Sequence, residues 1–338
     1  MKILLTGGAG YIGSHTAVEL IEDGYDVVIV DNLVNSSAKV IDRIEKITNV
    51  RPLFYQLDLR DSEKLDDIFS SHDVDAVIHF AGLKAVGESV EKPLLYYDTN
   101  INSTLKLLES MQKHGVKKLV FSSSATVYGS PKELPLTEAS LVGIDILNPY
   151  GWSKYMIEKI IEGFTTSNPG FQATILRYFN PIGAHESGLI GENPIGVPNN
   201  LVPYVAQTAT GMHNTVRVWG DDYDTPDGTA IRDYIHVTDL ARGHLAALNI
   251  ETDWVNIYNL GTGKGHSVIE VIAEFSNACG HKIPYEIHPR RDGDTIVCYA
   301  DPTKAEQELG WRATKSLGEM CRDAWNWQSK NPQGYSDH

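Results

Sequence analysis

The stretch "LLTGGAGYIGSH", residues 4–15, decides the fold of this 338-residue chain. Two leucines lie in an apolar run, and Gly7, Gly10 and Gly13 follow at GxxGxxG spacing before a helical pattern begins. A glycine turn between a strand and a helix lets backbone amides approach a pyrophosphate at the helix N-terminus. The same turn could serve only to pack the strand against the helix, and its spacing differs from the GxGxxG of many dehydrogenases. The turn by itself leaves both interpretations open.

An acidic residue at the end of the next apolar run favours dinucleotide binding. Asp31 directly follows "DVVIV", residues 26–30. A carboxylate at the end of the second strand would hydrogen-bond the adenosine ribose hydroxyls and repel a 2′-phosphate. No arginine follows it in "DNLVNSS", residues 31–37. We therefore predict that the cofactor is NAD and not NADP.

Six short apolar runs alternate with helical patterns through the first half of the chain. They are rich in Val, Ile and Leu and begin at residues 2, 26, 53, 76, 118 and 173. This alternation predicts an α/β fold, with a Rossmann-like doubly wound parallel sheet that binds NAD in residues 1–180. A smaller α/β domain in residues 181–338 should mainly bind the substrate, with some C-terminal segments returning to the sheet. The tail from residue 331 should be mobile.

The charge balance argues against nucleic-acid and membrane partners, and the cysteine count argues against a disulfide-bonded protein. The chain has 29 Lys and Arg against 44 Asp and Glu, a net charge of −15, so it should repel nucleic acid and anionic membranes. Its three cysteines are too few for a disulfide framework, and it has no apolar run of about 18 residues. It opens directly on an apolar run, without a signal-peptide pattern. We expect a cytoplasmic protein with free thiols and with no metal, nucleic-acid or membrane partner.

Two polar motifs suggest the chemistry. Ser124 lies in "SSSATVYG", residues 122–129, and Tyr150 and Lys154 lie in "YGWSK", residues 150–154. An i, i+4 pair shares one helix face, so the lysine ammonium can sit beside the phenol and, with the positive nicotinamide of NAD, favour the phenolate. Tyr150 can then take a proton from a substrate hydroxyl while hydride leaves the same carbon, and Ser124 can orient or relay that proton. The alternative is a chance YxxxK with a half-buried tyrosine and a solvated lysine.

Taken together, ten motifs that run in order from residue 1 to about residue 335 resemble the UDP-glucose 4-epimerases, within the extended short-chain dehydrogenase/reductase family. They are "TGGAGYIGSH", "DNL", "HFAGLKAVGES", "SSSATVYG", "YGWSK", "LRYFNPIGAH", "GVPNNLVPY", "RDYIHVTDLA", "YNLGTG" and "RRDGD". The resemblance implies an isomerase that interconverts UDP-galactose and UDP-glucose with tightly held NAD.

The resemblance also implies contacts for the cofactor and the substrate. The residues expected at NAD are Gly7, Gly10, Tyr11, Ile12, Gly13, Asp31, Asn32, Asn35, Ser36, Asp58, Leu59, Phe80, Ala81, Gly82, Lys84, Tyr150, Lys154 and Phe179. Those expected at the UDP-sugar are Ser124, Tyr150, Asn180, Asn200, Leu201, Val216, Val218, Arg232, Arg291, Asp294 and Cys298. The two arginines would supply positive charge that the acidic chain otherwise lacks. The resemblance further suggests a homodimer formed by helices of the NAD domain, including residues 94–114.

The implied reaction is an oxidation followed by a return. Tyr150 takes the 4-hydroxyl proton, C4 gives hydride to NAD, the 4-keto sugar turns over while UDP stays anchored, and hydride returns to the opposite face. The alternatives are a nucleotide-sugar dehydratase and a non-catalytic dinucleotide-binding regulator. Dehydratases carry an Asp and a Glu after the active-site Ser or Thr, where this chain has Ala125 and Thr126. A regulator would need none of the Ser, Tyr and Lys side chains.

Two positions depart from the family pattern. Cys298 stands where many of these epimerases carry a bulky Tyr that closes the sugar pocket. A thiol leaves room for a 2-acetamido group, so we predict that UDP-N-acetylhexosamines are substrates as well. Alternatively, Cys298 is a small buried hydrophobe and another side chain fills the gap. Thr99 stands where a relative has Asn, so neither Thr99 nor Asn100 is assigned a role.

Overall fold

The structure is built around one large parallel sheet. The computed structural model describes residues 1–251, 254–291 and 295–335, and within them this sheet has 7 strands, all paired in parallel. In spatial order they are β10 (Val255–Leu260), β6 (Gln172–Tyr178), β5 (Lys118–Ser124), β4 (Ala76–His79), β1 (Lys2–Thr6), β2 (Asp26–Asp31) and β3 (Leu53–Gln56). The order reverses between β1 and β4, as in a doubly wound Rossmann fold. The predicted fold class is confirmed.

Most apolar runs of the sequence are strands that are covered on both faces, whereas β3 at the edge of the sheet is only partly buried. Each of the six predicted runs forms one strand of the large sheet. In β1, Ile3 and Leu5 pack into one hydrophobic core and Leu4 packs into another. Successive side chains of a strand point to opposite faces, so a strand buried on both sides needs an unbroken apolar run.

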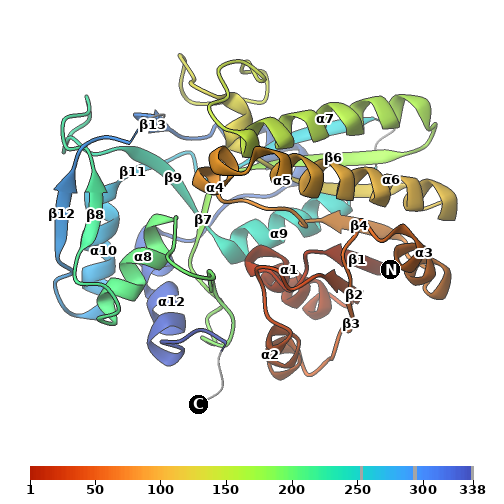
Figure 1. The fold of residues 1–338 in the computed structure, drawn as a ribbon, viewed down its shortest axis with the longest axis horizontal. Coiled ribbons are helices and arrows are strands. Elements are labelled where there is room, and N and C mark those ends of the chain that lie inside the picture. The colour runs from red at the N-terminus through yellow and green to blue at the C-terminus, as the bar shows by residue number, and fades with distance from the viewer. Residues whose placement is uncertain (252–253, 292–294, 336–338) are drawn as a thin grey trace.

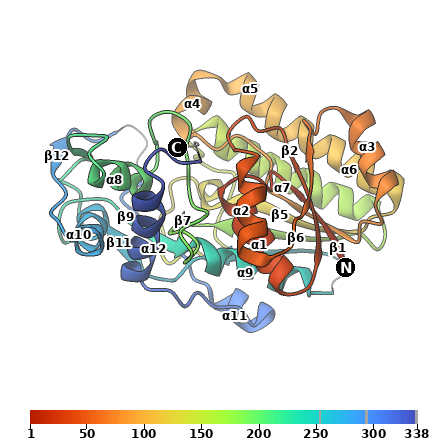
Figure 2. The same cartoon turned by 90° about the horizontal axis from the view of Figure 1, so that it is seen from below.

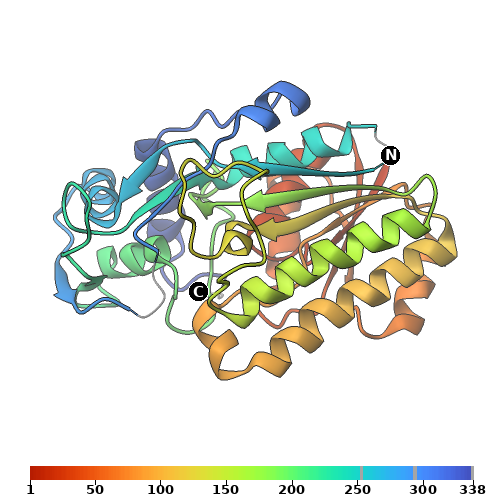
Figure 3. The ribbon, with the colours of Figure 1, turned by 90° about the horizontal axis from the view of Figure 1, so that it is seen from above.

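Helices cover both faces of this sheet, as Figures 2 and 3 show from opposite sides. On one side lie α1 (Tyr11–Glu22), α2 (Lys39–Thr48), α9 (Val237–Leu248) and α11 (Thr303–Leu309). On the other lie α3 (Ser62–Ser71), α4 (Val86–Glu91), α5 (Pro93–Tyr97), the π-helical turn η1 (Asp98–Asn102), α6 (Ser103–His114) and α7 (Pro149–Ser167). A short 3₁₀ turn, η2 (Ala125–Tyr128), follows β5 directly. The helices leave the carboxyl ends of the strands open toward the second half of the chain (Figure 1).

The second half forms a smaller unit beside those strand ends (Figure 1). Its strands are β7 (Asn180–Ile182), β9 (Ile231–His236), β11 (Gly265–Ser267) and β13 (Val297–Cys298) in one sheet, and β8 (Val216–Trp219) and β12 (Tyr285–His288) in another. Its helices are α8 (Leu201–Ala209), α10 (Val268–Cys279) and α12 (Leu317–Lys330). Both α10 and α12 begin with a capping box, in which a serine and a glutamate satisfy the first free backbone amides. β10 and α9 also come from this half of the sequence but belong to the large sheet and its helical layer, and the predicted boundary at residue 180 stays a prediction.

The C-terminal segment is packed against the protein. The prediction of a mobile tail from residue 331 is wrong as far as the described residues reach. Tyr335 is only 8% exposed, and its ring lies 4.8 Å from that of Trp327 in α12. Tail mobility is expected only where the backbone makes no tertiary contacts, and this segment makes several. No helix in the described ranges is long and apolar enough to cross a membrane.

Candidate active site

A cavity of about 660 Å³ lies where the large sheet meets the second half. Side chains at the carboxyl ends of β1, β2, β4, β5 and β6 line one part of it, and residues of the second half line the rest. This is the crevice at the topological switch point where doubly wound folds bind nucleotides. Every residue predicted to contact NAD lines this cavity. Their individual contacts with NAD stay predictions.

The glycine turn has the shape that a pyrophosphate cradle requires. Gly7 has φ +70°, and a Cβ there would lie 2.7 Å from the backbone nitrogen of Ala81. A Cβ on Gly13 would lie 2.5 Å from the carbonyl oxygen of Gly7, so only glycine allows α1 to start this close to β1. Gly10 caps α1 with no side chain over the free amides. The exposed helix N-terminus and the absence of side chains fit the phosphates of a dinucleotide.

Asp31 is held at the rim of this turn. Its carboxylate accepts hydrogen bonds from the Ala9 amide at 3.1 Å, the Leu33 amide at 2.9 Å and the Ser36 hydroxyl at 2.8 Å. These bonds tie the glycine turn to the loop after β2, and both segments line the cavity. The position at the end of β2 suits recognition of ribose hydroxyls and opposes a 2′-phosphate.

A second acidic side chain supports the same rim. Asn32 donates to Asp58 at 3.2 Å, and Arg60 forms an ion pair with Asp58 at 2.8 Å. The hydrogen bond from Arg60 lowers the pKa of Asp58 to about 2, so this carboxylate is ionised at neutral pH. Asn32 and Asp58 both line the cavity, as predicted from the sequence motifs.

Lys154 is buried at the edge of the cavity, between α7 and β5. Its ammonium donates to the Ser122 carbonyl oxygen at 2.7 Å and lies 4.9 Å from the Phe121 ring centroid. Burial lowers the pKa of Lys154 to about 8, although Glu158 one turn along α7 opposes this effect. A lysine in this environment can change its charge near neutral pH, which a solvated lysine cannot do.

Tyr150 stands at the first turn of α7 and faces the cavity. The Asn148 side chain accepts from the Gly151 amide at 2.8 Å and so fixes the start of the helix. Burial raises the pKa of Tyr150, while the nearby Ser124 hydroxyl and the charge of Lys84 act in the opposite direction. Ser124 and Tyr150 are thereby brought together from β5 and α7.

The YxxxK spacing predicted Lys154 as the cation that acts on the Tyr150 phenol, and the structure adds Lys84. The Lys154 nitrogen lies 5.9 Å from the Tyr150 ring centroid, and its hydrogen bond goes to β5. Sharing a helix face brings two side chains near each other but does not decide where a long side chain ends. The charge that opposes the rise in the Tyr150 pKa is that of Lys84, in the loop after β4, for which only a contact with the cofactor was predicted.

A buried ionic network supports this corner from below. Glu158 is fully buried and pairs with the almost fully buried Arg177 at 2.7 Å, and Ser123 donates to the same carboxylate at 2.5 Å. Arg177 also donates to the Tyr128 hydroxyl at 3.1 Å. The network joins β5, η2, α7 and β6, the elements that carry the Ser, Tyr and Lys side chains. Loss of Glu158 or Arg177 would leave the other as an unpaired buried charge.

Most residues predicted at the substrate also line the cavity, namely Ser124, Tyr150, Asn180, Asn200, Leu201, Val216, Arg232 and Arg291. Val218 does not: it is 1% exposed and packs in the core of the second half. Cys298 is not on the cavity wall either, and its side chain packs against the cluster that contains Val127 and Phe179. Cys298 is paired in register with Arg232, so the two side chains point to the same side of the sheet. Asp294 lies outside the described residues.

Some residues that line the cavity were not predicted from the sequence. Tyr178, Glu192, Trp219 and Tyr335 line the cavity, and Thr99 does so as well. Glu192 is the single charged residue in the Gly, Pro and Asn-rich run at 188–200, a signal that could have found it. Asn100 is buried and holds the Leu83 backbone through its side chain, at 2.7 Å to the amide and 3.0 Å to the carbonyl.

The fold and the site define a class of protein. A doubly wound sheet with a glycine turn at its switch point, and Ser, Tyr and Lys side chains gathered at β5 and α7, are the framework of a dinucleotide-dependent enzyme of the short-chain dehydrogenase type. Residues 3–261 match the NAD dependent epimerase/dehydratase family, and the chain belongs to that family. No group of three or more metal-ligating side chains was found in the ranges that the structure describes.

Known proteins resemble this chain over its whole length. The UDP-glucose 4-epimerase of Yersinia pestis is 54% identical and is covered completely, as is this chain. A crystal structure of UDP-glucose 4-epimerase from Bifidobacterium longum in complex with NAD+ and UDP has a TM-score of 0.96 at 55% identity, covering 99% of this chain and 100% of that one. The UDP-Glc/GlcNAc 4-epimerase from Campylobacter jejuni has a TM-score of 0.84 at 36% identity, covering 97% and 99%.

Proposed function

We propose that this protein is an NAD-dependent 4-epimerase of UDP-hexoses, which interconverts UDP-galactose and UDP-glucose. One observation carries the proposal: Ser124, Tyr150 and Lys154 meet at a cavity whose other wall holds Arg232 and Arg291. A proton-transfer group thus faces a site with positive charge for a nucleotide diphosphate. Full-length relatives with this activity at 53–55% identity support it.

The residues divide the reaction between them. Tyr150 removes the proton from the C4 hydroxyl, and Ser124, which lies close to the phenol at the end of β5, orients that hydroxyl. NAD, when bound, supplies a reversible hydride acceptor for C4. Lys154 and Lys84 place positive charge near the phenolate, so the proton can be taken and returned at neutral pH. Arg232 and Arg291 hold the diphosphate while the 4-keto sugar turns over, and the proton then returns from Tyr150.

The sugar pocket is proposed to accept UDP-N-acetylhexosamines too. Cys298 is paired in register with Arg232, which lines the cavity, although Cys298 itself packs against the cluster that contains Phe179. A small side chain at this position leaves more room for a 2-acetamido group than a phenol ring would. The similarity to an epimerase that acts on UDP-Glc and UDP-GlcNAc supports this extension.

The proposal extends to assembly and location. Apolar side chains are exposed along the α4 to α6 region, with Val90 60%, Leu94 80% and Leu105 39% accessible. Helix faces of this kind suit an isologous contact between two copies, so we propose a homodimer. Sedimentation of the purified protein would test it. The three cysteines are free, which agrees with a reducing compartment, and we propose the cytoplasm.

The decisive experiment follows the sugar by NMR. Purified protein, with no NAD added, is mixed separately with UDP-galactose and UDP-N-acetylgalactosamine at equal concentration. Conversion of both establishes an epimerase with retained cofactor and an open pocket. Conversion of UDP-galactose alone leaves the epimerase and removes the N-acetyl extension. Conversion of neither, even after NAD is supplied, overturns the proposed activity.

A further inference from the structure

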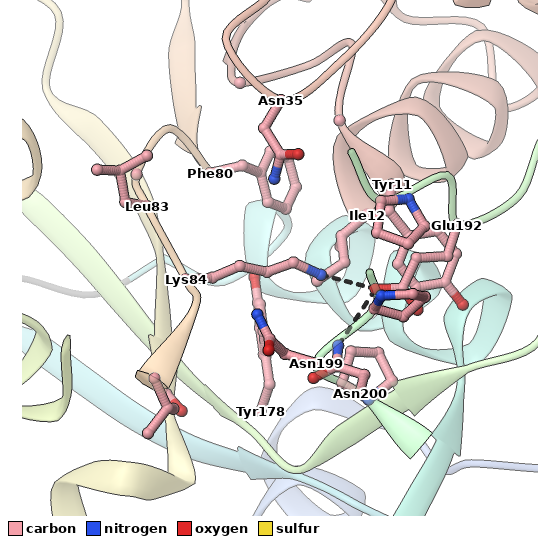
Figure 4. A pocket seen from close by; sticks show the side chains of 18 of the residues that line it. Tyr11, Ile12, Asn35, Phe80, Leu83, Lys84, Tyr178, Glu192, Asn199 and Asn200 are labelled. Carbon is pink, nitrogen blue, oxygen red and sulfur yellow. Dashed lines mark hydrogen bonds and ion pairs between the residues drawn. The ribbon is translucent and has the colours of Figure 1, made fainter. Parts of the chain in front are cut away.

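An acidic side chain joins the two walls of the cavity (Figure 4). Glu192 lies in the connection between β7 and α8, at residues 183–200. Its carboxylate forms an ion pair with Lys84 at 2.8 Å and accepts a hydrogen bond from Asn200 at 3.2 Å. Lys84 belongs to the cofactor wall, whereas Asn200 precedes α8 on the substrate wall. One carboxylate oxygen therefore contacts a residue predicted at NAD and a residue predicted at the UDP-sugar.

The backbone around Glu192 is held by the C-terminal segment. The indole nitrogen of Trp327 donates to the Glu192 carbonyl oxygen at 3.1 Å. The Tyr335 hydroxyl accepts from the Gly191 amide and donates to the Gly191 carbonyl, both at 3.2 Å. A Cβ on Gly191 would lie 2.3 Å from the Trp327 ring, so this close packing requires glycine. The position of Glu192 therefore depends on Trp327 and Tyr335, which lie 135 or more residues further along the chain.

The charge of Lys84 links this contact to the reactive phenol. Partial burial disfavours the Lys84 ammonium, but the Glu192 carboxylate outweighs that effect and the pKa of Lys84 is raised. Lys84 in turn acts against the raised pKa of Tyr150. The charged and titratable groups around the Tyr150 phenol are Lys84, Lys154, Tyr96, Tyr178 and the Ser124 hydroxyl. Among them, Lys84 has a carboxylate partner that reaches across the cavity.

We propose that Glu192 is a positioning residue that holds the Lys84 and Asn200 side chains in place on opposite walls of the cavity. Tyr335 and Trp327 fix the backbone that carries Glu192. This inference rests on the proposed epimerase function, because it assigns Lys84 to the cofactor wall and Asn200 to the substrate wall of that reaction. Glu192 offsets part of the Lys84 charge and fixes the start of α8. It acts through these two residues and takes no part in proton transfer itself.

The first test is the pH dependence of kcat for UDP-galactose, measured with saturating NAD. In Lys84→Met, Tyr150 loses a nearby cation, its pKa rises, and the acid limb of the profile moves up by about one pH unit. In Glu192→Gln, the amide still accepts from Lys84 but no longer offsets its charge, so the acid limb moves down by about half a unit. Glu162→Gln removes the carboxylate of the surface pair with Lys159 and is the matched control. Shifts of both variants in one direction, or no shift, would overturn the inference.

The second test measures UDP binding by calorimetry and needs no turnover. Glu192→Ala removes the acceptor for Asn200 and should weaken UDP binding about fivefold, the effect of one hydrogen bond. Tyr335→Phe keeps the ring contact with Trp327 but frees Gly191, and should weaken it by less. Glu192→Gln should bind as the unaltered protein does. If Glu192→Ala binds UDP as tightly as the unsubstituted protein does, the inference is overturned. If the unsubstituted protein binds UDP but converts no sugar, the proposed function is overturned, and the UDP-binding measurement still tests the role of Glu192.

Discussion

The corner where β5 meets α7 and the connection between β7 and α8 both line the cavity, and they are held in different ways. At the corner, Lys154 and Glu158 project from regular elements and are buried, with bonds to β5 and β6. In the connection, Glu192 has no helix or strand of its own and is fixed by side chains from α12 and the C-terminal segment. At the corner, the side chains project from a helix and strands that carry their own backbone hydrogen bonds. The connection is ordered by a few tertiary contacts.

The difference suits the two tasks of an epimerase. Proton transfer requires fixed distances, and rigid elements position catalytic groups more accurately than loops do. The substrate wall must hold the nucleotide while the sugar turns over, so its supports can be local and separable. Variants at the corner should therefore affect the chemical step, and variants on the connection should affect binding or the pH profile.

Loss of the phenol should have the largest effect. Tyr150→Phe keeps the ring but removes the proton acceptor, and kcat should fall about a thousandfold. Tyr155→Phe is the matched control, because Tyr155 lies on the same helix and packs against Trp152. Both are measured with UDP-galactose at saturation. A fall in the control alone, or equal falls in the two variants, would contradict the assignment of Tyr150.

Loss of the buried ammonium should come next. Lys154→Met should lower kcat about a hundredfold, because it removes the cation behind the phenol. The Lys154 pKa of about 8 means that the charged form is present below pH 8 and is lost above it. The unaltered enzyme should therefore lose activity as the pH rises through about 8, and this basic limb should be absent in Lys154→Met. A basic limb that persists in the variant would assign it to another group.

The fold and much of the site could be predicted because their signals are local. Strand–turn–helix spacing around Gly7, the acid at Asp31 and the YxxxK pair each depend on residues within one or two neighbouring elements. Because crossover connections between parallel strands are right-handed, alternating strands and helices leave few possible strand orders. The resemblance to known motifs identified the arginines of the substrate wall, which no periodicity would have indicated.

What the sequence could not provide depends on distant contacts. Tyr335 contacts Gly191 from 144 residues away, and no spacing rule connects the two. Lys84 was assigned to the cofactor, but its influence on Tyr150 depends on where a long side chain ends. Val218 shares a face of β8 with Val216, which lines the cavity, and the alternation along the strand does not indicate where on that face the cavity ends.

A smaller effect is expected at the glycine turn. Gly7→Ala combines a positive φ with a 2.7 Å contact to the Ala81 backbone. It should lower the free energy of unfolding, or weaken the binding free energy of NAD, by about 2 kcal/mol. Gly24→Ala is the control, since Gly24 also has a positive φ, of +85°, but nothing lies within 4 Å of its Cβ. The readouts are the thermal midpoint and the NAD content after purification. Equal losses in the two variants would show that backbone strain, and not the crowded cradle, is responsible.

The smallest effect should be a change in preference at Cys298. Cys298→Tyr should reduce the rate with UDP-N-acetylgalactosamine about tenfold relative to UDP-galactose, because the ring would occupy space needed by the acetamido group. Cys298→Ala keeps the small volume and should retain both activities, which separates volume from thiol chemistry. Cys298 packs against the cluster with Phe179 and not on the cavity wall, so the larger ring must extend from that cluster toward Arg232 to have this effect. If the tyrosine variant kept both activities, the ring would be accommodated in the core, and the breadth of the pocket would depend on the connection at residues 183–200.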